Sequence, residues 1–147
     1  MLHIFHRAFV GIILFFLSTY SFAKCIESTV RHLEFSKEIT KELVLCFDEL
    51  DSNFIQSQSC YESKTADCLA IKKIKRTIPV KLNKLVTSQG SPRSKLCIQS
   101  GGMPVDSEYK HSENSQWKQT EFCIFSDESF VNGALLMSLN KKALGLK

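Results

Sequence analysis

LCIQSGGMPV at residues 96–105 and EFCIF at residues 121–125 frame the stretch that sets the C-terminal fold. Just upstream, Ser91-Pro92 predicts the start of a helix, because serine caps a helix N-terminus and proline fits its first position. Gly101-Gly102 predicts the end of that helix, since glycine adopts the left-handed conformation without strain. A short helix that stops at a glycine pair is therefore expected at the head of this module.

The rest of the stretch predicts a hairpin and a second helix. The polar run 106–119 has no periodicity and indicates a loop, whereas Phe122 and its apolar neighbours indicate a strand. Ser126-Asp127-Glu128 is typical of a turn, and Ser129 is placed to cap a last helix through Leu139. The expected local order is helix, hairpin, helix.

Residues 91 to about 137 resemble the bacterial exported domain of unknown function that is labelled haemolysin. Members of that family carry a pattern like N-P-A-x-x-Y-C-x-x-x-G-G, then C-x-F-x-D-G-S-x-C-x-x-W, then a final cysteine. The chain matches this pattern at Pro92, Cys97, Gly101, Gly102, Cys123, Phe125, Asp127 and Ser129. It departs from it at Glu128, Val131, Ala134 and near Lys141, where the family has glycine, cysteine, tryptophan and cysteine.

Two of the family's cysteines are thus missing together, as expected if they pair with each other. The resemblance therefore implies a disulfide between Cys97 and Cys123, which would contribute about 3.5 kcal/mol by loop closure. The haemolysin label brings no residue-level mechanism with it.

The first 23 residues predict a signal peptide. A start that contains Arg7 precedes a ten-residue apolar run, and Ser21-Phe22-Ala23 offers small residues before a cleavage site. We expect cleavage after Ala23 and export to the periplasm or the medium. An uncleaved anchor is one alternative, and a lipid anchor at Cys25 is another, although Lys24 does not suit that chemistry.

Six cysteines follow the predicted signal, at positions 25, 46, 60, 68, 97 and 123. An even number in a small exported chain predicts three disulfides. A zinc site and a reactive thiol are the competing hypotheses, but the chain contains no C-x-x-C pair. We expect structural cysteines, no metal and no cofactor.

Residues 25–50 show a helical pattern, with apolar residues on one face and charges on the other. In a continuous helix Cys25 and Cys46 would lie about 31 Å apart, too far for a disulfide. Each must then pair elsewhere, and the pairs that we expect first are Cys46–Cys60 and Cys25–Cys68, provided that residues 61–67 are extended and not helical.

Residues 69–90 are basic and contain no acidic residue. Lys72, Lys73, Lys75 and Arg76 surround a narrow isoleucine stripe, so residues 69–85 could contact an anionic membrane surface. The alternative is that the stripe packs inside the protein while the cations face water. Nucleic acid is not an expected partner, because no aromatic residues alternate with the cations.

The sequence as a whole predicts an α+β, helix-rich protein. A helical, disulfide-linked region would span 24–90, and a helix/β-hairpin/helix module 91–147. No residue set pairs a nucleophile with a base, so we expect a non-catalytic module that binds a protein or envelope partner. Trp117 is either a cover on the core or an exposed partner contact. The alternative function is a membrane-active protein acting through 69–85.

Overall fold

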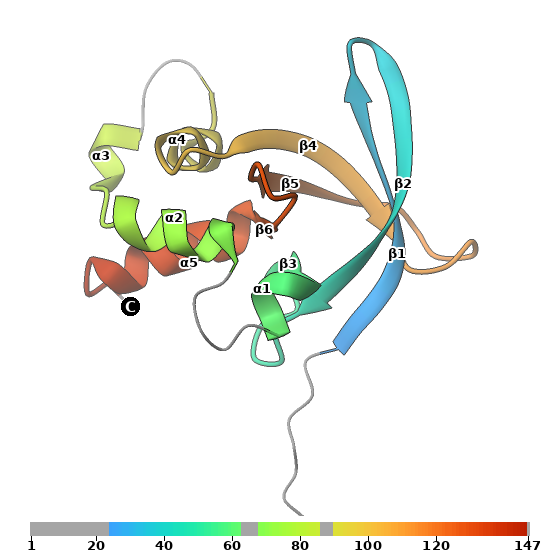
Figure 1. Cartoon of the computed structure of the whole chain (residues 1–147), viewed down its shortest axis with the longest axis horizontal. Coiled ribbons are helices and arrows are strands. Elements are labelled where there is room, and N and C mark those ends of the chain that lie inside the picture. Colours follow the sequence, from blue (N-terminus) through green and yellow to red (C-terminus); the bar gives the residue numbers. More distant parts are fainter. Residues whose placement is uncertain (1–23, 63–67, 86–89, 147) are drawn as a thin grey trace, which may run out of the picture.

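The computed structural model of the chain describes residues 24–62, 68–85 and 90–146. In this part, six strands form a closed antiparallel barrel, and short helices gather on one side of it (Figure 1). The strands are β1 (Lys24–Glu34), β2 (Lys37–Phe47), β3 (Ile55–Ser57), β4 (Met103–Lys110), β5 (Lys118–Ile124) and β6 (Phe130–Asn132). The helices are α1 (Gln58–Glu62), α2 (Leu69–Thr77), α3 (Leu82–Leu85), α4 (Pro92–Gln99) and α5 (Gly133–Ala143). The predicted signal peptide lies outside the described residues.

Residues 24–47 form a β-hairpin, and the helix predicted for 25–50 is wrong. Every residue of β1 pairs with one of β2, from Lys24 opposite Phe47 to Glu34 opposite Lys37. Phe35 and Ser36 form the turn, with φ angles of 48° and 67°. Apolar residues spaced by four, which suggested a helix, also fall on one face of a strand, because four is a multiple of the strand period of two.

The distal part of this hairpin, residues 33–38, extends beyond the barrel and is called the arm. β1 pairs with β4 only through Thr29–His32, and β2 pairs with β3 only through Leu45–Phe47. Within the described residues, the arm therefore pairs only with itself. Its tip carries Phe35, which is 94% exposed, and Figure 1 shows the arm clear of the rest of the molecule.

The barrel closes in the order β1-β2-β3-β6-β5-β4. β4 and β5 form the predicted hairpin, although both strands run further into the polar stretch than the sequence indicates. β6 pairs with β5 on one side and reaches β3 on the other through Gln56 and Val131. The interior is filled by seven buried residues: Val30, Leu45, Phe47, Ile55, Tyr109, Phe122 and Phe130.

A second core lies between the barrel wall and the helices. Ile74 of α2, Leu96 of α4 and Leu136 of α5 are fully buried there, together with Val131 from β6. Because the side chains of a strand alternate between its two faces, β5 and β6 supply residues to both cores. Figure 1 shows α2 and α5 lying together on the side of the barrel away from the arm.

The expected helix-rich α+β fold is therefore wrong, and the protein is a small closed β-barrel with short helices. The predicted order of helix, hairpin and helix is present as α4, β4–β5 and α5. Its strands, however, pair with the N-terminal hairpin in a single barrel. The error follows from the hairpin at 24–47, which was expected to be helical.

The structure contains three disulfides, which are consistent with an oxidising, exported environment. Cys97 pairs with Cys123, as the resemblance implied. The predicted pairs Cys46–Cys60 and Cys25–Cys68 are wrong, since Cys25 pairs with Cys46 and Cys60 with Cys68. In the hairpin, Cys25 and Cys46 are directly opposite and their Cα atoms lie 4.0 Å apart.

The two glycines after α4 have different physical roles. Gly101 has a φ of +79°, the left-handed conformation expected at a helix end. Gly102 instead faces the disulfide, and a Cβ atom there would lie 2.5 Å from Sγ of Cys123 and 3.1 Å from Sγ of Cys97. The glycine pair therefore both ends α4 and lets the backbone pass the disulfide.

Ser129 caps a helix, but not the one predicted. α5 begins at Gly133 with Asn132 as its N-cap, because residues 130–132 form β6. Ser129 Oγ instead accepts a hydrogen bond from Ala70 N–H of α2 at 3.0 Å, and Asp127 Oδ2 accepts one from Leu69 N–H at 3.1 Å. Partial burial raises the pKa of Asp127, but hydrogen bonds from Ser129 and Leu69 outweigh it and the pKa is lowered.

Candidate functional site

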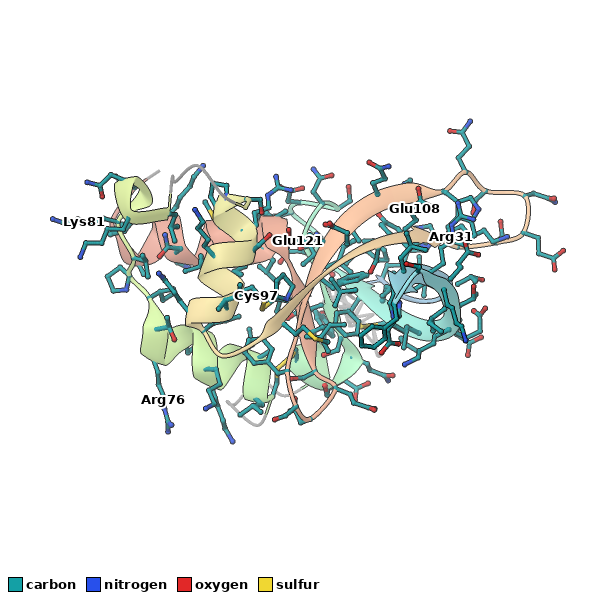
Figure 2. The ribbon with its side chains drawn as sticks, turned by 90° about the horizontal axis from the view of Figure 1, so that it is seen from above. Arg31, Arg76, Lys81, Cys97, Glu108 and Glu121 are labelled. Carbon is teal, nitrogen blue, oxygen red and sulfur yellow. A yellow bond between two sulfur atoms is a disulfide. The ribbon has the colours of Figure 1, made fainter. Side chains whose placement is uncertain are left out.

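A groove of about 1390 Å³ runs along β4 and β5, from the base of the arm to α4 and α5. Its lining residues come from four regions of the chain: Arg31, His32, Leu33, Glu38 and Phe54; Ser91, Pro92 and Arg93; Asp106, Ser107, Glu108, Gln119, Thr120 and Glu121; Ala134, Met137, Ser138 and Lys141. Figure 2 shows Arg31 beside Glu108, with Glu121 nearer the helices. Most of the residues that line this groove, which we treat as the candidate site, are polar or charged, and five are apolar.

Arg31 organises the arm end of the groove. It lies opposite Glu108 in the β1–β4 pairing. Its Nε donates to Glu108 Oε2 at 2.7 Å, its Nη2 lies 2.6 Å from the same oxygen, and Glu38 is 3.7 Å away. Both partners are about one-third exposed, so this pair contributes at most about 1 kcal/mol to stability. Its main effect is to hold two opposite charges in fixed positions in the groove.

The helix end of the groove is held by hydrogen bonds to Glu121. Its Oε2 atom accepts hydrogen bonds from Ser94 Oγ at 2.7 Å and from Ser91 Oγ at 3.2 Å. Ser91 is also the N-cap of α4, as predicted. The start of α4 is therefore attached to the outer face of β5, which fixes the width of the groove at this end.

Three charged groups in the groove have no partner among the described residues. Asp106 on β4, Arg93 on α4 and Lys141 on α5 are all exposed, and their charged atoms form no hydrogen bond or salt bridge there. The stem of Arg93 lies against α5, where a Cβ atom on Gly133 would come within 2.7 Å of Arg93 Cδ. The two free cations are on the helices, and the free carboxylate is on the strand.

Trp117 lies just before β5, outside the groove. Its ring stacks on Arg31, whose Cζ lies 4.1 Å from the ring centroid, and Lys110 Nζ is 5.0 Å away. The tryptophan is half-buried and packs on charged side chains, so it is neither a cover on the apolar core nor a fully exposed contact. It instead backs the arginine that lines the groove.

The structure also brings a serine and a histidine together. Ser28 Oγ lies 3.0 Å from His111 Nδ1, and the imidazole packs on Phe47 and Tyr109. Burial lowers the pKa of His111, and Lys118 and Lys24 lower it further. Ser28 is only 1% exposed and also contacts the carbonyl oxygen of Ile26 at 3.2 Å. A nucleophile must reach its substrate, so we assign this pair to the structure of the barrel.

The predicted membrane contacts Lys72, Lys73, Lys75 and Arg76 all lie on α2. The isoleucine stripe of the same helix faces the helix-side core, where Ile74 is fully buried and Ile71 and Ile78 pack against it. The stripe therefore packs inside the protein, which was the alternative to a membrane contact in the sequence analysis. It shares a core with residues of α4 and α5 and with cysteines. None of the four cations lines the groove.

Sequence reasoning did not find the groove residues. Arg31 and Glu108 are 77 positions apart, and only the strand register brings them together. Within the described residues, no three His, Cys, Asp or Glu side chains are grouped to hold a metal ion. A membrane-spanning helix is likewise not found there.

Comparison with known proteins gives no match: no family model, curated protein or solved structure matches this chain.

Proposed function

We propose that the protein is an exported, non-catalytic binding protein that holds an extended peptide segment of a partner in the groove. The observation that carries this proposal is the set of charges without a partner among the described residues, because two cations on the helices and one carboxylate on the strand line the same groove. A peptide carries charges of both signs and backbone amides along its length. Gln119, Thr120 and Ser138 offer hydrogen-bonding groups, and Leu33 and Met137 offer apolar contacts.

A binding role without catalysis is supported by the chemistry of the groove. Its only lining histidine is His32, and no hydrogen bond to that ring is present among the described residues. The hydroxyl groups of Ser91 and Ser94 donate hydrogen bonds to Glu121. This contact fixes their position, and within the described part of the chain neither hydroxyl contacts a histidine that could activate it as a nucleophile. The resemblance of residues 91–137 to an exported domain agrees with the proposed export, but it indicates neither an activity nor a partner.

Peptide selection tests this proposal. Peptides selected from a displayed random library on the oxidised protein should bind one site. Trp117 provides the readout, because it is the single tryptophan of the chain and stacks on Arg31, which lines the groove. A ligand that pairs with Arg31 or Glu108 should change its emission.

A groove variant with Arg93→Gln, Asp106→Asn and Lys141→Gln should bind the selected peptides at least about ten-fold more weakly, since each lost charged hydrogen bond costs about 1.5–3 kcal/mol. Lys73→Gln, Lys75→Gln and Glu113→Gln make the matched control, because they change the same charges outside the groove lining and away from Trp117. Equal affinity of the peptides for both variants would contradict the proposal.

A further inference from the structure

The end of the molecule opposite the arm is strongly basic. Seven exposed cations come from α2, the adjoining segment through α3, and the last turns of α5: Lys73, Lys75, Arg76, Lys81, Lys84, Lys141 and Lys142. The sequence contains no aspartate or glutamate between residues 69 and 105 or between 129 and 147. We call this set of seven side chains the basic end.

Tertiary contacts hold the basic end together. The side-chain amide of Asn140 forms two hydrogen bonds with the backbone of Val80, at 2.8 and 2.9 Å. Lys81 therefore lies next to the end of α5, which carries Lys141. Figure 2 shows Arg76 and Lys81 projecting outward at the same end of the molecule.

Local helix electrostatics explain only part of this charge. Lys75 and Arg76 are in the last turn of α2, and Lys141 and Lys142 in that of α5, where cations interact favourably with free carbonyl groups. That effect does not account for Lys73 or Lys81. None of the seven cations forms a salt bridge with a described residue. Their positive charge therefore faces the solvent.

We propose that the basic end docks on an anionic membrane surface as a peripheral contact. Insertion of α2 is not part of the proposal, because its isoleucine stripe is already packed in the helix-side core. The seven cations come from α2, the segment that follows it, α3 and α5, all at one end of the molecule, as suits a flat array of phosphate groups. A single-stranded nucleic acid is usually bound by stacking on aromatic rings, and residues 69–85 and 140–146, which carry these cations, contain none.

This contact is separate from the proposed groove function and does not depend on it, although Lys141 belongs to both surfaces. On a membrane, the molecule would stand on α2, α3 and the end of α5, with the arm on the side of the barrel away from these helices (Figure 1). Its tip would then be free to meet a partner.

The test is flotation of the oxidised protein with phosphatidylcholine vesicles, with and without phosphatidylglycerol, at low and physiological salt. The protein is produced by export in a bacterial host, and its N-terminus is read by mass spectrometry. We expect binding only to the anionic vesicles and a steep loss with added salt, because exposed charges are screened. Each cation near the surface should contribute about five-fold to the binding constant.

Two variants with the same net charge distinguish a defined surface from general attraction. Replacing Lys75, Arg76, Lys81 and Lys142 with Gln should weaken binding several hundred-fold, whereas replacing Lys24, Lys37, Lys41 and Lys118 with Gln should weaken it less than about ten-fold. Circular dichroism checks that both variants fold. The groove peptides should bind the first variant normally, since none of its four changes lies in the groove.

Three results would overturn the proposal. Equal losses in both variants would show attraction by net charge alone. Tighter binding to an oligonucleotide than to anionic vesicles would assign the surface to nucleic acid. Release of a trapped dye at physiological salt would show insertion and favour a membrane-active protein instead.

Discussion

The amide of Asn140 is paired with the backbone of Val80 as one strand residue pairs with another. Its Oδ1 accepts from Val80 N–H at 2.8 Å, and its Nδ2 donates to the carbonyl oxygen of Val80 at 2.9 Å. Asn140 itself is completely buried. One side chain of α5 thus fixes the segment that leads from α2 to α3.

Asn140→Ala should lower the free energy of unfolding by about 2–3 kcal/mol, because two backbone groups lose their partners in a partly buried place. Urea denaturation monitored by Trp117 fluorescence measures this change. Asn114→Ala, in the exposed β4–β5 loop, is the control and should change stability by less than about 0.5 kcal/mol. A similar decrease in the free energy of unfolding in both variants would show that the hydrogen bonds between Asn140 and Val80 do not stabilise the protein.

Gly102→Ala should destabilise the oxidised protein by about 1–3 kcal/mol, because the new Cβ would overlap the Cys97–Cys123 disulfide. Gly101→Ala should cost about 1 kcal/mol for a different reason, since it places a side chain at positive φ. Denaturant unfolding of the two single variants measures both costs.

Removal of the Cys97–Cys123 disulfide should distinguish the destabilisation by Gly102→Ala from that by Gly101→Ala. In a Cys97→Ala, Cys123→Ala background, most of the penalty of Gly102→Ala should disappear, whereas that of Gly101→Ala should remain. A Gly102→Ala penalty that is unchanged in this background would show that the sulfur atoms are not its cause.

Stability should fall as the pH falls below 6.5, because the folded state holds the pKa of His111 below its ordinary value. Above pH 6.5 the imidazole is neutral in both states. Below it the unfolded chain binds the proton first, so unfolding becomes more favourable until the pH passes the folded pKa. Unfolding free energies measured between pH 8 and pH 5 report this loss.

His111→Phe should remove most of that pH dependence, since phenylalanine fits among Phe47 and Tyr109 but does not titrate. His32→Gln, on the same barrel, should keep the dependence of the natural chain. The reverse pattern in these two variants would assign the effect to His32.

The sequence predicted best the elements whose ends carry local signals. α4 begins at Pro92 after its Ser91 cap and ends before Gly101-Gly102, as predicted. Such signals act through neighbouring residues, so they can be recognised in the sequence alone. β5 was found in the same way, from a short apolar run between polar segments.

The elements that define the barrel lack such signals. The turn at Phe35-Ser36 has no Asn-Gly pair, and the apolar spacing of β2 also suits a helix. β6 is only three residues long and leads directly into α5, so the sequence does not separate its residues from that helix. Because residues 25–50 were expected to be helical, the disulfide between Cys25 and Cys46 was excluded from the predicted pairs. The groove could not be predicted either, since it depends on the strand register, which no local pattern specifies.

The barrel is closed without a covalent lock. Its smallest junction is the single pairing of Gln56 with Val131, and none of the three disulfides links the strands of residues 24–57 to those of residues 103–132. Asn132 secures this junction, accepting from Ile55 N–H at 3.1 Å and donating to the Asn53 carbonyl at 2.6 Å. Separation of β3 from β6 would therefore leave all three disulfides intact, so reducing agents and mechanical opening would act on different parts of the molecule.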